Sequence, residues 1–333
     1  MNLKRTSLAA ALFALAISSS SVAAELTLPA DGWVSWQAAA VADAPDMCCW
    51  VGTKGDAASR SACKLDDQRG NLGNRDNAKT DAVRVYARLK GGKVERLRAL
   101  SASCPVETLT PIRELGEIEA DDSMRWLIAL SRRGDDTKKE DARDNVISAI
   151  AMHRGDVAYD GLADVARNGE HLESRKSALF WLAKARGVAG ADLVSQMMFG
   201  DRDPELREHA AFAITESRSP RIAQDLIRLG NTDKDGEVRS QAWFWLAETG
   251  AVESETAIGA ALRKDADDHV REQAIFALSQ LRDERGTRAL ISLAEDRSLP
   301  AVQRKRAVFW LAQSEANGAH VYLEKVLAGK VRP

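Results

Sequence analysis

An arginine followed three residues later by an alanine recurs along the second half of the chain at a nearly constant interval. The interval is roughly 32 residues, within the range of about 20–50 residues that is typical of repeat proteins. A period of this length favours a solenoid or a propeller over a single compact core. A degenerate earlier copy spans 143–150. The repeat arginines are Arg175, Arg207, Arg239, Arg271 and Arg304.

Each repeat contains the pattern of two short helices. Apolar residues are spaced three and four apart after each arginine, which is helical spacing. Turn-forming segments such as 200–204 and 233–236 separate the copies, and a second helical stretch, for example 222–229, fills the rest of each unit. Strand alternation is absent here, which argues against a propeller. We therefore expect an all-α solenoid of about six units over residues 121–329.

A phenylalanine follows each repeat arginine by five residues. At about 100° per residue, this position lies far from the face that packs on the partner helix. Two interpretations are open: an exposed aromatic strip on the concave surface that binds an extended peptide or a helix, or a ladder mostly covered by neighbouring repeats. We favour the covered ladder. The candidate surface consists of Phe180, Phe212, Phe244, Phe276 and Phe309.

The next position alternates between tryptophan and alanine. Trp181, Trp245 and Trp310 occupy it in one set of repeats, and alanine occupies it in the others. The helical wheel places this position on the core face, so we expect large and small side chains to interdigitate there.

The first residues have the pattern of an export signal. Lys4 and Arg5 precede the apolar run 8–17, and small residues ending at Ala24 predict cleavage before Glu25. The run is far shorter than the ~20 residues that span a bilayer. We expect residues 1–24 to be removed and the mature protein to be periplasmic or secreted, without membrane insertion.

Export determines how the cysteines are interpreted. Cys48, Cys49, Cys63 and Cys104 are even in number and all precede the repeats. In an oxidising compartment they predict two disulfides, with Cys48 and Cys49 each pairing with Cys63 or Cys104. A zinc site is the alternative, but adjacent cysteines fit its ligand spacing poorly. A redox role for the vicinal pair is a third interpretation.

The segment around the cysteines predicts a β-rich domain over residues 25–115. Residues 83–89 alternate with period two, and Gly91-Gly92 before 94–100 is typical of a hairpin turn. We expect a further strand at 33–36 and an exposed loop at 66–79. Trp33, Trp36 and Trp50 also suggest glycan binding as a minor hypothesis.

No motif in the chain indicates catalysis or a metal site. Residues 231–238 match part of a calcium loop, but Ala242 stands where the bidentate glutamate is required. The same segment aligns with the turn of every repeat, so we expect a capped helix start. The five histidines do not cluster. We therefore expect no cofactor and no metal.

The repeat resembles a known family in its most regular copies. The pattern Asp-x-x-Val-Arg-x-x-Ala at 267–274 is similar to the second helix of HEAT repeats of the phycobilin-lyase type. The phrases at 274–280 and 307–313, with Met47-Cys48-Cys49 upstream, resemble exported bacterial HEAT-repeat proteins. The resemblance implies binding to other macromolecules, although chromophore lyases and DNA glycosylases exist on similar repeats.

These observations together predict a non-enzymatic interaction scaffold in the cell envelope that binds a protein through the concave surface. Lysine and arginine total 47 against 49 acidic residues, which gives no electrostatic basis for nucleic-acid binding. We expect a monomer. The alternative is an enzyme or a chromophore- or redox-handling protein that uses the cysteine domain.

Overall fold

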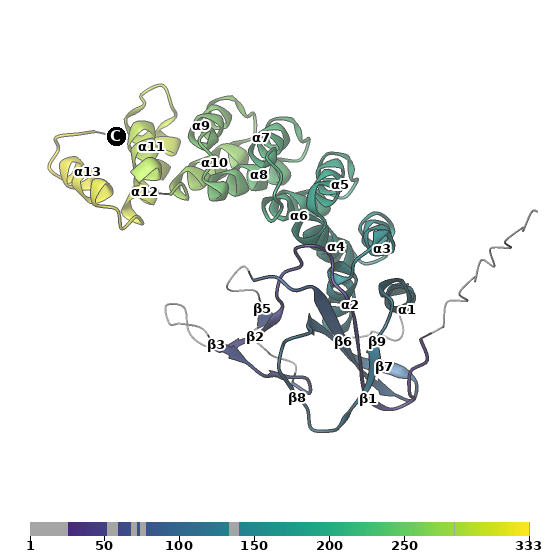
Figure 1. Cartoon of the computed structure of the whole chain (residues 1–333). Coiled ribbons are helices and arrows are strands. Elements are labelled where there is room, and N and C mark those ends of the chain that lie inside the picture. Colours follow the sequence, from purple (N-terminus) through teal and green to yellow (C-terminus); the bar gives the residue numbers. More distant parts are fainter. Residues whose placement is uncertain are drawn as a thin grey trace, which may run out of the picture.

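The computed structural model describes residues 26–51, 59–67, 72–73, 78–132, 140–282 and 284–332. The predicted signal segment 1–24 and its cleavage site lie outside these residues. The described chain forms a small β-rich region followed by a helical solenoid that bends into an arc (Figure 1). The last strand ends at Glu117 and the first helix begins at Ala120, so the expected domain limits, 25–115 and 121–329, fall around this junction.

The principal sheet has four strands in the order β7-β6-β1-β9. Strand β1 pairs antiparallel with β6 and parallel with β9, which returns from beyond the cysteines. The predicted hairpin forms between β6 and β7, and both turn glycines have positive φ, at 58° and 74°. The strands are β1 (Gly32–Ala39), β6 (Ala82–Lys90), β7 (Lys93–Ser101) and β9 (Ile112–Glu117).

Shorter strands carry the cysteines beside this sheet. One set pairs in the order β3-β2-β5, and β4 pairs parallel with β8. Most of the predicted loop 66–79 lies outside the described residues, but Asp66 at its start is half-buried and accepts hydrogen bonds from Trp33 and Thr108. The strands are β2 (Cys48–Val51), β3 (Ser59–Ser61), β4 (Cys63–Lys64), β5 (Leu72–Gly73) and β8 (Val106–Glu107).

The helices stack in two rows along the arc. From α3 onward, the odd-numbered helices form the outer row and the even-numbered helices α4 to α12 form the inner row (Figure 1). The helices are α1 (Ala120–Arg132), α2 (Glu140–Met152), α3 (Asp156–Asn168), α4 (Leu172–Ala185), α5 (Gly187–Gly200), α6 (Pro204–Thr215), α7 (Ile222–Thr232), α8 (Gly236–Thr249), α9 (Ser254–Lys264), α10 (Asp268–Ser279), α11 (Glu284–Glu295), α12 (Ala301–Ala312) and α13 (Asn317–Leu327).

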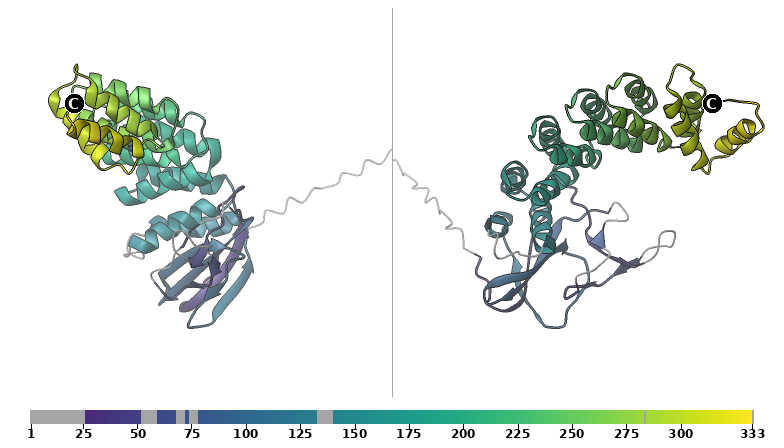
Figure 2. Two further views of the ribbon diagram at one scale, coloured as in Figure 1. Left: turned by 90° about the vertical axis from the view of Figure 1, so that its left-hand side faces the viewer. Right: turned by 180° about the vertical axis from the view of Figure 1, so that it is seen from behind.

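The β-rich region lies on the inner side of the arc, at its N-terminal end. Figure 2 shows the same arrangement from two further sides, with the C-terminal helices standing well away from the strands. The inner row therefore remains open from its middle to its C-terminal end.

One continuous core joins the two regions. Residues of β1, β6 and β7 belong to the same buried cluster as residues of α1 and α2. The Trp36 indole packs edge-on against Trp126 at 5.2 Å and donates to Ser123 Oγ at 2.7 Å. Ser123 also contacts Nε2 of the fully buried His153, whose Nδ1 lies 2.7 Å from the Ala149 carbonyl oxygen.

That carbonyl can only accept, so Nδ1 of His153 carries the proton and Nε2 accepts from Ser123. Burial lowers the pKa of His153 to about 4, which keeps the ring neutral. The network therefore joins a β-strand to two helices with each of these contacts satisfied.

The burial pattern corrects two expectations. Trp36 and Trp33 are 1% exposed and Trp50 is 4% exposed, so they cannot stack on a glycan, and the glycan-binding hypothesis is wrong. In the solenoid, the wheel placed Trp245 and Trp310 in the core, but both are half-buried at its edge.

In α4 to α10 the inner helices are also buried one position after the repeat alanine, a position that the wheel did not assign to the core face. Trp243 occupies that position and is fully buried against Gly230 of α7. The wheel considered one partner helix, whereas an inner helix contacts its outer partner and two inner neighbours. The buried arc of each helix is wider as a result.

Candidate functional site

A continuous row of aromatic rings crosses the inner helices. Phe180 stacks on Phe212 with ring centroids 6.0 Å apart, and Phe244 stacks on Phe276 at 5.8 Å. Tryptophans connect these pairs: Trp245 lies 4.8 Å from Phe212 and 4.9 Å from Phe244. We call this set the aromatic strip: Phe180, Trp181, Phe212, Phe244, Trp245, Phe276, Phe309 and Trp310.

The strip is neither fully covered nor fully exposed. Phe180, Phe212, Phe244 and Phe276 are half-buried, and Phe309 at the open end is 46% exposed. Neighbouring repeats therefore cover part of the surface of each ring, as the covered-ladder interpretation requires. The uncovered part of the rings faces solvent along five consecutive inner helices, and this surface is available for binding.

A cleft of about 500 Å³ opens at the middle of the strip. Trp245 lines it from α8, with Glu248 one turn further along the same helix. The opposite walls come from the start of α7 and from the turn after α10. The lining residues are Thr215, Pro220, Ile222, Ala223, Trp245, Glu248, Thr249, Ala251 and Arg282.

Ion pairs between successive repeats hold the inner helices in register. Arg207 binds both carboxylate oxygens of Asp233 at 2.8 and 2.9 Å, and Arg239 binds Asp265 in the same way at 2.8 and 3.0 Å. Arg175 pairs with Asp201. The series ends at Arg271, which pairs with Asp268 of its own helix, because the corresponding next position holds Arg297.

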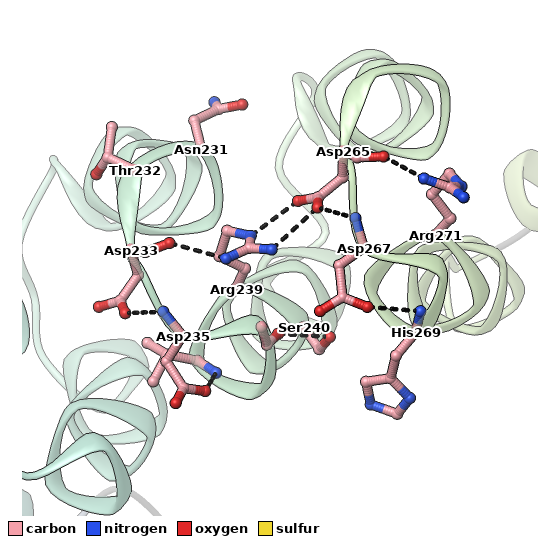
Figure 3. A network of polar contacts seen from close by, with 12 residues as sticks. Asn231, Thr232, Asp233, Asp235, Arg239, Ser240, Asp265, Asp267, His269 and Arg271 are labelled. Atoms are coloured by element: carbon pink, nitrogen blue, oxygen red, sulfur yellow. Dashed lines mark hydrogen bonds and ion pairs between the residues drawn. The ribbon is translucent and has the colours of Figure 1, made fainter.

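Each of these aspartates also accepts a hydrogen bond from a backbone amide of the turn that follows it, as Figure 3 shows for Asp233 and Asp265. Asp233 accepts from the backbone amide of Asp235 at 2.9 Å, and Asp235 caps α8 by accepting from the Glu237 and Val238 amides. Burial alone would raise the pKa of Asp233, but the hydrogen bonds from Arg207 and the Asp235 amide outweigh it and lower the pKa. These contacts engage the oxygens that a calcium loop would need, and they support the capping interpretation.

The sequence reasoning used the repeat arginine as a marker but missed this role. The signal was present: an aspartate stands six residues before Arg207, Arg239 and Arg271, and each pairs with the arginine of the preceding repeat. Pairing across repeats becomes visible only when the units are stacked.

The structure pairs Cys48 with Cys104 and Cys49 with Cys63, so no cysteine among the described residues is free. All four are buried, in a cluster that includes Trp33 and Leu65. Sγ of Cys63 lies 3.6 Å from Sγ of Cys104, so the two disulfides are in contact.

The histidines occupy separate environments in the described chain. His153 lies in the junction described above, and His209 packs edge-on against Phe212 at 5.5 Å. His171, His269 and His320 are exposed. They do not form a catalytic or metal-binding group with one another.

A comparison with protein-family models matches residues 228–309, from α7 to α12, to HEAT repeats. No curated protein matches the chain. The chain is similar to the solved structure of the Escherichia coli protein YibA, with 19% identity and a TM-score of 0.37 over 63% of this chain and 79% of that one. It is also similar to human deoxyhypusine hydroxylase in complex with glycerol, with 13% identity and a TM-score of 0.28 over 61% of this chain and 89% of that one.

At these TM-scores neither likeness carries an inference about activity. The fold is that of an α-solenoid containing HEAT repeats, preceded by a small disulfide-bonded β-rich region. No helix in the described part of the chain has the length and apolar character needed to cross a membrane.

Proposed function

We propose that the protein is a monomeric, non-enzymatic scaffold of the bacterial cell envelope that binds a partner protein along the aromatic strip. The observation that carries this proposal is the half-exposed ring row across five inner helices of a HEAT-containing solenoid. Contiguous apolar surface of this kind is characteristic of interaction sites. The β-rich region adjoins the arc as far as the contact between Asp43 and Arg218 after α6, and the C-terminal helices stand clear of it (Figure 2).

Affinity capture from an envelope extract tests the proposal, with the mature chain from residue 25 as bait. Phe276→Ala and Phe309→Ala in combination should abolish capture of the specific partner, identified by mass spectrometry. The control is Phe199→Ala on the outer helix α5, where the ring contacts Arg228. If the strip variant still captures the same protein while the control behaves identically, the strip is not the binding site.

The export part of the proposal has its own test. Expression of the full chain in a Gram-negative host, followed by fractionation and N-terminal sequencing, should find a periplasmic protein that begins at Glu25. Retention of residues 1–24 in the cytoplasmic fraction would contradict both cleavage and location.

Redox chemistry in the β-rich region is a second candidate, favoured by the 3.6 Å contact between the two disulfides. Adjacent disulfides can exchange partners once a thiolate is present. Thiol titration of the unreduced, denatured protein distinguishes the two functions. A scaffold with stable disulfides should show no free thiol, whereas a persistent reactive thiol would favour the redox candidate.

A further inference from the structure

Two carboxylates beside the aromatic strip lack a cation. Among the described residues, neither Glu208 on α6 nor Glu248 on α8 has an ion-pair partner, although neighbouring acids do: Lys184 pairs with Glu216 at 2.6 Å. Both residues are half-buried in the described structure.

The helix dipole compensates neither carboxylate. Glu208 lies in the second turn of α6, beyond the first turn where the helix dipole stabilises an acid. Glu248 lies in the last turn of α8, which contains no basic residue and where the dipole disfavours negative charge. A cation supplied from outside would relieve both.

The surroundings of Glu208 are themselves acidic. Burial raises the pKa of Glu208, and the charges of Glu237, Asp235 and Glu205 raise it further. The opposing cation is Lys176, but this side chain is already bound to Glu173 at 3.0 Å and Glu205 at 3.3 Å.

The two carboxylates flank the central aromatic pair. Glu208 is four residues before Phe212, and Glu248 is three residues after Trp245, so each lies on the same helix face as its ring. The Phe212 and Trp245 rings are 4.8 Å apart, so these two rings and the two glutamates form a row across α6 and α8. The cleft beside Trp245 adds space for an inserted side chain.

We infer that the partner segment bound here is basic, with lysine or arginine side chains placed over Phe212 and Trp245 and paired with Glu208 and Glu248. This inference rests on the proposed function. A long cationic side chain matches the row, because its stem packs on the exposed parts of the rings and its donors pair with the carboxylates.

Other partner chemistries fit the row less well. An apolar segment would cover Glu208 and Glu248 and leave them unpaired, and an acidic segment would be repelled by them. Arg282 also lines the cleft, but its guanidinium donates to the Glu248 backbone carbonyl, at 3.4 Å, and forms no ion pair with the Glu248 carboxylate within the described residues.

Fluorescence anisotropy with synthetic peptides tests the inference on the mature full-length chain. Three labelled peptides of about 12 residues alternate alanine and leucine with arginine, glutamine or glutamate at the same positions. The arginine peptide should bind most tightly, and Glu208→Gln and Glu248→Gln should each weaken it about tenfold. Phe212→Leu should weaken it too, because the stem of the bound side chain loses part of its packing surface. Glu255→Gln on the outer helix α9 removes the same charge elsewhere and should have no effect.

The outcomes separate the inference from the function on which it rests. Tighter binding of the glutamine or glutamate peptide, weakened by Phe212→Leu, would overturn the basic partner and keep the strip as the binding site. No saturable binding of the arginine peptide up to about 1 mM would also overturn the inference. Binding that none of the inner substitutions alters would count against both. Thermal melts of each variant confirm that the chain remains folded.

Discussion

The β-rich region and the solenoid are stabilised by contacts that differ in sequence separation. In the β-rich region, the stabilising contacts join residues far apart in sequence: one disulfide spans 56 positions, and β1 pairs with β9 across the whole region. In the solenoid, each unit contacts only the next, through an arginine and an aspartate 26 positions apart and through rings of adjacent repeats. Damage to one long-range contact should therefore affect the whole β-rich region, whereas damage in the solenoid should remain local.

Loss of the longer disulfide is the largest expected effect. Replacing Cys48 and Cys104 together by serine should destabilise the β-rich region by about 4 kcal/mol, because the reduced chain regains the entropy of a long loop. Hydrogen exchange should show loss of protection throughout β6 and β7, with α8 to α10 almost unchanged.

The matched variant removes the Cys49–Cys63 bridge, which closes a loop of 14 positions, and should cost about 1 kcal/mol less. Equal loss of protection in both halves would show that the two regions unfold as one unit and would contradict the contrast drawn above.

The second effect is in the solenoid. The side chain of Arg207 is 3% exposed and that of its partner Asp233 is 6% exposed. Arg207→Ala removes the guanidinium and leaves the buried Asp233 carboxylate without its ion-pair partner. The expected cost is about 3 kcal/mol. It should appear as faster exchange in α6 to α8 with the β-rich region intact.

Arg271→Ala is the control, because its partner Asp268 is 93% exposed and the pair resembles an ordinary surface ion pair. It should cost about 1 kcal/mol, from the weak surface pair and the hydrogen bond to the Asp265 carbonyl. Similar losses for the two variants would mean that the buried pairs do not hold the repeats in register.

These contrasts also explain what could be predicted from the sequence. The solenoid is specified by local periodicity, so its helices and the position of the phenylalanines follow from a helical wheel. The partners of the cysteines and the hydrogen bonds of Asp66 depend on segments brought together only by the fold. The helical wheel missed the partial exposure of Trp245, because this exposure depends on how adjacent repeats stack and not on one helix alone.

The pH dependence of stability tests the junction between the halves. The pKa of His153 in the folded chain, about 4, lies below the usual 6.5, so the unfolded chain binds the proton more readily. Stability is fully present above pH 6.5 and falls as the pH drops towards 4, by about 3 kcal/mol from this group. Urea midpoints measured between pH 7 and pH 4 should follow this fall.

His153→Gln keeps an acceptor for Ser123 and cannot titrate, so its midpoints should vary less with pH although its stability at pH 7 is lower. His320→Gln, at an exposed site, should leave the wild-type profile unchanged. A steep wild-type dependence that persists in His153→Gln would place its origin in other groups.

The smallest expected effect distinguishes a capped helix start from a calcium loop within the solenoid. Asp235→Ala removes the side-chain acceptor for the first amides of α8 and should cost about 1 kcal/mol, because those donors then depend on water. Lys234→Ala, at the exposed neighbour, should change stability little. Hydrogen exchange should become faster at the start of α8 and not in the β strands, because the cap stabilises only the start of its own helix. If calcium raises the melting temperature of the wild type and Asp235→Ala abolishes that rise, the carboxylate is a metal ligand and its capping role is secondary.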